Sequence, residues 1–220
     1  MSLDLVICAL VLVAVQLRIS ANLLSLRGRV VLAGLVFVWS LLPYPWGPGA
    51  WVLSYLAGFS ISSGLLAVLA IQHRVAGHYW LPVRELRTAC LMLVLMALWF
   101  YPMSMGSSYA DPYALGFGHF GFSTALLLVG LLAWVMRAYA SCLILVAAQC
   151  AFGAGLLTSD NLWDYLIDPW LVCWAAGWLL RDRLLRARAM PAPQPSVQPS
   201  EAGKDAGGAT EAAGQSSATR

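Results

Sequence analysis

Three side chains in the second half of the chain could perform acid–base chemistry. Asp164 and Asp168 are carboxylates four residues apart, and His119 lies in an apolar run that precedes them. A carboxylate and an imidazole can exchange protons near neutral pH, so these three form the candidate catalytic set. The side chains expected to line the same outward-facing pocket are Asn161, Gln149, Ser123 and Asp111.

The spacing of these acids indicates how deep they lie. Asn161, Asp164 and Asp168 fall at i, i+3 and i+7, so one continuous helix would place them on one face. A helix that began only at Pro169, capped by Asp168, would have an apolar part of roughly 18 Å, too short to cross about 30 Å of hydrocarbon. We therefore expect a span over residues 162–180, or a short interfacial turn that leads into the span, and in either case Asp168 lies below the outer interface. A carboxylate at that depth is by default a hypothesis of function.

A structural role is the competing interpretation. His119 and Asp168 would then form a buried hydrogen bond that joins two helices, while Asp164 would lie in solvent. Other chemistry has weaker support, because residues 121–124 only approach the GxSG pattern of intramembrane serine proteases and no histidine follows His119. The remaining histidines lie in a basic loop, and no cluster has metal-ligand spacing. We predict no metal and no cofactor.

The elements that must position these residues are membrane helices. Of the 220 residues, 60% are hydrophobic and 10% are charged, whereas soluble domains carry about 25% charged residues. Apolar runs near the length that crosses a bilayer recur along the chain. We therefore predict an all-α integral membrane protein, a seven-helix bundle formed by residues 1–188. Its expected spans are residues 3–24, 30–42, 50–71, 86–101, 113–136, 139–157 and 162–180.

The charged links predict the orientation of this bundle. Seven spans place every link that carries arginine on one side, and Asp4, Asp111, Asp160 and Asp164 on the other. The positive-inside rule then predicts an outer N-terminus and a cytoplasmic C-terminus. Residues 189–220 are rich in Pro, Ala, Gly, Ser and Gln, which predicts a disordered cytoplasmic tail. Arginine almost replaces lysine, which indicates a GC-rich bacterial genome and hence the inner membrane.

Two further patterns concern helix packing. Ser54, Gly58 and Ser62 recur at four-residue spacing, which predicts a small-residue face where two helices approach closely. No inverted repeat and no pair of interrupted helices is evident, and both are typical of secondary transporters. Transport is therefore the least favoured of the functions considered.

One short set of motifs resembles a known family. Asp111, followed after seven residues by His119-Phe120, and then Trp163-Asp164 with Asp168, resembles the small VanZ-like membrane proteins. The resemblance covers a small part of the chain, and no activity or residue role is carried over from it.

These patterns favour a small bacterial inner-membrane protein that acts as a non-enzymatic accessory or scaffold component of an envelope process. Whether it is an enzyme stays open. The first alternative is an enzyme that uses the outward Asp/His pocket on a lipid-linked or periplasmic substrate, and the second is a proton- or cation-coupled transporter. The expected partners are the lipid bilayer and other envelope membrane proteins. Nucleic acid is not expected, because membrane topology accounts for the arginines.

Overall fold

A computed structural model describes residues 2–78, 80–107 and 111–189 of the chain. These residues form helices joined by short links and contain no strand, which confirms the predicted all-α class. The helices are α1 (Leu3–Ile19), α2 (Leu26–Ser40), α3 (Pro48–Leu56), α4 (Ile61–Ala76), α5 (Val83–Pro102), α6 (Phe120–Val135), α7 (Tyr139–Gly153), α8 (Leu162–Leu166) and α9 (Pro169–Ala189). Two short helical turns, η1 (Ser20–Asn22) and η2 (Met103–Ser107), follow α1 and α5 directly. A third, η3 (Tyr113–Gly116), precedes α6.

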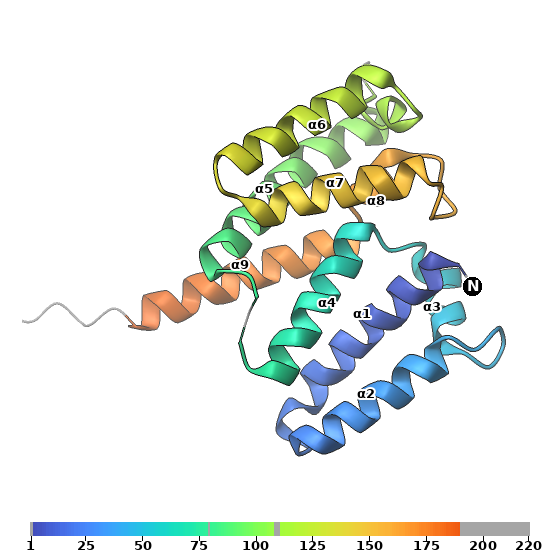
Figure 1. Ribbon diagram of the computed structural model, residues 1–220, viewed down its shortest axis with the longest axis vertical. Helices are drawn as coiled ribbons and strands as arrows, with labels where there is room; N and C mark the ends of the chain where they lie inside the picture. The colour runs from blue at the N-terminus through green and yellow to red at the C-terminus, as the bar shows by residue number, and fades with distance from the viewer. Residues whose placement is uncertain (1, 79, 108–110, 190–220) are drawn as a thin grey trace, which may run out of the picture.

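Two helical hairpins flank a central pair of helices. Figure 1 shows the α1–α2 hairpin on one side, the α6–α7 hairpin on the other, and α4 and α9 between them. Helix α4 packs on α1, and α5 packs on α9. The largest core cluster surrounds α8, where Trp163 and the fully buried Tyr165 pack against Phe100 and Leu126. A smaller cluster joins α1 to the α3–α4 link through Ile7, Cys8 and Phe59.

The lengths of the helices bear on the predicted number of spans. Among the described residues, two helical segments are long and apolar enough to cross a membrane, Leu3–Asn22 and Val83–Gly106. Helices α4, α6 and α7 are apolar but shorter. The prediction is thus confirmed for the helical class, while the seven-span count is not. The predicted tail, apart from residue 189 at the end of α9, lies outside the described residues.

Three expected spans are interrupted, so the prediction of continuous helices there was wrong. Between α3 and α4, Ala57 has φ of 63°, and between α8 and α9, Ile167 is extended with φ of −142°. Neither conformation continues a right-handed helix. These residues are apolar, so a hydrophobic run alone gives no sign of the break. The divided spans are 50–71 (α3 and α4), 113–136 (η3 and α6) and 162–180 (α8 and α9).

Candidate functional site

The carboxylate of Asp168 lies where α4 and α9 begin, and it is 4% exposed. Its Oδ2 accepts three hydrogen bonds, from the backbone N–H of Ser60 at 3.0 Å, the Ser60 hydroxyl at 2.7 Å and the Ser63 hydroxyl at 2.6 Å. Its Oδ1 accepts the backbone N–H of Leu171 at 2.8 Å. The chain therefore supplies this buried acid with four donors of its own.

Local sequence explains why these donors converge. Ser60 is the N-cap of α4, and its hydroxyl oxygen also accepts the N–H of Ser63 at 3.1 Å. Asp168 caps α9, whose first residue is Pro169, a position that suits proline because no N–H is needed there. Helix N-termini carry partial positive charge, so a carboxylate shared by two of them is held by both dipoles. Figure 1 shows the two helices starting side by side and diverging.

This arrangement corrects two expectations about the last span. A helix that begins after Asp168 was rejected as too short, but α9 continues past Arg181 to Ala189. The rejection was wrong because it ended the helix at the first arginine, although arginine is a good helix former and does not end a helix. Because the break at Ile167 separates α8 from α9, Asn161, Asp164 and Asp168 do not share the face of one helix.

Asp164 belongs to a different cluster, around Tyr113. Its Oδ2 accepts the Tyr113 hydroxyl at 3.1 Å and the Ser159 hydroxyl. Asn161 caps α8 and donates to the Tyr113 carbonyl at 3.0 Å. Asp111 accepts the Tyr113 N–H at 2.9 Å. Two predicted pocket residues, Asp111 and Asn161, and the candidate catalytic Asp164 are thus brought together around Tyr113, where their hydrogen bonds hold short helical turns.

The structure places the remaining predicted residues elsewhere. His119 is exposed immediately before α6, and no hydrogen bond within the described part of the chain joins it to Asp164 or Asp168. The predicted His119–Asp168 hydrogen bond was therefore wrong, since the serines of α4 take that place. Gln149 donates to the Ser123 carbonyl at 3.3 Å and so links α7 to α6. Within the described ranges, no group of three or more His, Cys, Asp or Glu side chains could hold a metal ion.

Sequence reasoning missed the serines that hold Asp168. Ser54, Gly58 and Ser62 were expected on one packing face, but the α3–α4 break falls among them, so that face does not exist. The available signal was serine at positions 60 and 63, three residues apart at the start of an apolar run, which is typical of a helix N-cap. It identifies the helix start, but it does not identify an acid that lies more than one hundred residues away, at position 168.

A second buried acid lies on the other side of the α3–α4 break. Asp4, which the sequence only predicted to lie on the outer side, is 6% exposed in the first turn of α1. Its Oδ2 has no hydrogen-bond partner among the described residues. A Cβ placed on Gly58 would lie 3.7 Å from its Oδ1. The break is therefore flanked by a fully bonded carboxylate at Ser60 and an incompletely bonded one at Gly58.

The two breaks form a pair. In α3–α4 and in α8–α9, a short helix is followed by non-helical residues and then by a longer helix. Both longer helices begin at the Asp168 carboxylate. The expectation that the chain has no paired interrupted helices was therefore wrong, because hydrophobic patterning does not reveal apolar breaks. Such pairs expose backbone groups and helix ends that can form binding sites within membrane proteins.

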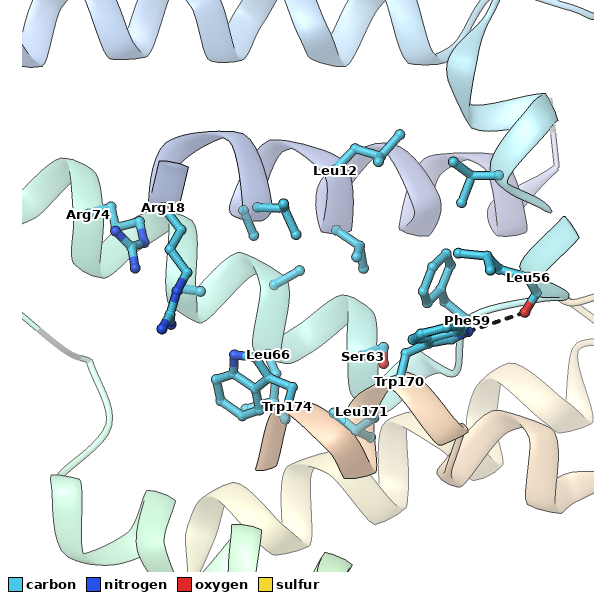
Figure 2. A pocket seen from close by; sticks show the side chains of 16 residues that line it. Leu12, Arg18, Leu56, Phe59, Ser63, Leu66, Arg74, Trp170, Leu171 and Trp174 are labelled. Carbon is cyan, nitrogen blue, oxygen red and sulfur yellow. Dashed lines mark hydrogen bonds between the residues drawn. The ribbon is translucent and has the colours of Figure 1, made fainter. Parts of the chain in front are cut away.

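An apolar groove of about 360 Å³ extends from this region between α1, α4 and α9. Figure 2 shows Leu56, Phe59 and Trp170 gathered at one end, where the Trp170 indole N–H donates to the Leu56 carbonyl at 3.3 Å. Arg18 and Arg74 lie at the opposite end (Figure 2). The remaining lining residues are Val11, Leu12, Ala14, Val15, Val52, Ser63, Leu66, Ala67, Ala70, Leu171 and Trp174.

Comparison with known proteins adds no family to these observations. No protein-family model, curated protein or solved structure matches this chain. The short resemblance to VanZ-like proteins therefore contributes no activity. Function has to follow from the acid-bridged helix ends and the groove.

Proposed function

We propose that the chain is a polytopic membrane protein of the bacterial inner membrane that acts as a non-enzymatic accessory or scaffold component of an envelope process. The observation that carries this proposal is the state of Asp168. Its two oxygens accept four hydrogen bonds from α4 and α9, and it is almost fully buried. A proton or substrate could reach it only by displacing these bonds, so the acid is better suited to fixing helices than to catalysis.

The outer surface supports the membrane location. Large apolar side chains are exposed over several helices, including Val31 of α2 (64%), Leu98 of α5 (69%) and Leu131 of α6 (59%). Soluble monomers rarely expose contiguous apolar patches above a few hundred Å². The helical segments Leu3–Asn22 and Val83–Gly106 have the length and composition of spans. In a bilayer, lipid chains would remove these exposed apolar side chains from water.

The proposed topology predicts opposite labelling of two exposed sites. In a cysteine-free background, Asp160→Cys should react with a membrane-impermeant maleimide in intact cells, because the link before α8 is expected outside. Arg27→Cys, at the start of α2, should react only after the cells are permeabilised. Gel-shift detection with a polyethylene glycol maleimide measures both. Equal labelling of the two sites in intact cells would contradict the orientation.

A second candidate function, proton- or cation-coupled transport, is favoured by Asp4. Burial of a carboxylate without full hydrogen bonding is costly, and such residues in membrane proteins mark proton and ion pathways. Asp4 lies beside the α3–α4 break, one of the paired interruptions. The enzyme alternative has weaker support, since His119 has no hydrogen bond to either acid in the described part of the chain.

Asp4→Asn separates these roles. If Asp4 is kept for proton or cation transfer, the neutral variant should unfold at the same or a higher temperature, because an uncompensated buried charge has been removed. The variant should also abolish ion-dependent proton flux into vesicles that contain the purified protein, measured as the fluorescence change of an enclosed pH-sensitive dye. A clear loss of thermal stability would instead place Asp4 among the structural acids, and unchanged flux would exclude it from transport.

A further inference from the structure

The apolar groove opens at one end into a cationic chamber. This second cavity, of about 330 Å³, shares Arg18 and Arg74 with the groove and is also lined by His73, Arg181 and Asp182. One carboxylate therefore faces three guanidinium groups. That carboxylate already accepts hydrogen bonds from two further arginines, Arg87 at 2.9 Å and Arg186 at 2.6 Å.

The net charge of the chamber follows from these contacts. Asp182 lies beyond the apolar part of α9, and the hydrogen bond from Arg87, with the charge of Arg186, holds the pKa of its carboxyl below the usual range. The negative charge of Asp182 is thus compensated by Arg87 and Arg186, which do not line the chamber. Arg74 also donates to the carbonyl of Leu17 at 3.5 Å, which anchors its guanidinium at the end of α1. The chamber is a positively charged space.

The groove has the dimensions of one lipid chain. From Ser63 to Arg74, α4 rises roughly 16 Å at about 1.5 Å per residue. Half of a hydrocarbon core of about 30 Å is roughly 15 Å. The small side chains of Ala14, Ala67 and Ala70 leave room between α1 and α4. An apolar chain of one leaflet would therefore extend from the cationic chamber to the end where Phe59 and Trp170 lie (Figure 2).

We propose that the groove and the chamber form a binding site for one anionic phospholipid of the inner leaflet. One acyl chain occupies the groove, and the headgroup phosphate lies between Arg18 and Arg74. Guanidinium groups bind phosphate oxygens through paired, charge-assisted hydrogen bonds. An anionic phospholipid is favoured over a zwitterionic one because its headgroup has no cation of its own to compensate the phosphate charge. The inference rests on the proposed membrane location, where arginine-rich links face the cytoplasmic leaflet with its anionic lipids.

Two kinds of variant test this site. Purified protein in detergent is titrated with dioleoylphosphatidylglycerol or dioleoylphosphatidylcholine, and bound lipid is counted by native mass spectrometry. Wild type should bind phosphatidylglycerol about tenfold or more tightly than phosphatidylcholine, and Arg18→Gln/Arg74→Gln should remove the difference. Arg18→Lys/Arg74→Lys keeps the charge and should retain part of the preference. Arg27→Gln, which lines neither cavity, is the control and should bind as wild type.

A second comparison tests the acyl chain. Ala70→Phe fills the groove and should weaken binding of phosphatidylglycerol, whereas Ala125→Phe on the exposed face of α6 should not. Glycerol phosphate, which has the phosphate but no acyl chain, should not compete. Equal binding of both lipids by wild type, loss of preference in Arg27→Gln to the same extent, or unchanged binding by Ala70→Phe would each overturn the proposal.

The membrane location is tested separately, by extraction of cell membranes with alkaline carbonate. Release of the protein into the soluble fraction would contradict the proposed function. Protein that stays in the membrane fraction but shows no lipid preference would contradict the lipid site alone.

Discussion

Asp168→Ala is expected to lower the stability of the protein by about 3–5 kcal/mol. The change removes a carboxylate that is 4% exposed and leaves the N–H groups of Ser60 and Leu171 and two hydroxyls without their acceptor. Each buried donor left without a partner costs about 1–3 kcal/mol, and hydroxyls recover part of this loss by rotating. For a chain of this size, the melting temperature should fall by roughly 6–20 °C.

Three serines near the start of α4 supply matched variants for this measurement. Ser60→Ala/Ser63→Ala removes the two hydroxyl donors to Asp168 and the N-cap of α4, and should reproduce much of the loss. Ser62→Ala should be neutral or slightly stabilising, because the buried Ser62 hydroxyl has no hydrogen-bond partner among the described residues. Asp160→Asn, on the surface, should stay within about 0.5 kcal/mol of wild type. Thermal unfolding of detergent-purified protein, followed by circular dichroism, compares all four.

The result decides between structural and chemical roles for the acid. A large loss in Asp168→Ala and in the serine pair, with Ser62→Ala unchanged, would show that Asp168 joins two helix ends. Unfolding of Asp168→Ala at the wild-type temperature would contradict this. The buried charge would then give the fold nothing, and its retention would point to proton transfer or catalysis at the break.

The pattern of hydrophobic residues predicted where helices occur better than it predicted whether each helix is continuous. The all-α class and the locations of α1 and α5 follow from long apolar runs that need no tertiary information. The breaks at Ala57 and Ile167 do not follow, because both residues are apolar and their backbone conformations are set by packing. Runs that look like one span are therefore divided into a short and a long helix.

The candidate site shows the same division between local and tertiary causes. The hydrogen bond of Asp111 is local, since its carboxylate oxygen accepts a backbone N–H only two residues away, at Tyr113. The link from Ser60 to Asp168 joins residues that are 108 positions apart and depends on how α4 and α9 are placed. The groove depends on three helices at once, and burial of Asp4 depends on the fold of the α3–α4 link. Residue types alone contain none of these facts.

Gly116→Ala, a change beside the start of α8, is expected to lower the stability of the protein by about 2–4 kcal/mol. A Cβ at this position would lie 1.7 Å from Asn161 Oδ1 and 2.8 Å from Trp163 Cδ1. Asn161 is fully buried and cannot move freely, because its Oδ1 accepts the Trp163 N–H and its amide donates to the Tyr113 carbonyl. Overpacking typically costs about 1–3 kcal/mol, and loss of the α8 cap adds about 1 kcal/mol.

Gly34→Ala is the control for this change. Gly34 lies in the exposed part of α2, with nothing within 4 Å of its added Cβ. Alanine is the better helix former, so the variant should gain about 0.5–1 kcal/mol. Opposite shifts in melting temperature for the two glycine variants are the expected result. A neutral or stabilising effect of Gly116→Ala would contradict the close packing of η3 on the start of α8.

Helix α8 connects these two measurements. A helix of five residues is far shorter than the roughly 12–15 residues needed for independent stability, so α8 exists because its ends are held. Gly116 allows Asn161 to cap its start, and Asp168 ties the residues after its end to α4. If α8 depends on both attachments, the double variant Gly116→Ala/Asp168→Ala should lose less than the sum of the single losses, because the first loss already frees the helix. Full additivity would instead show that the two attachments stabilise separate parts of the bundle.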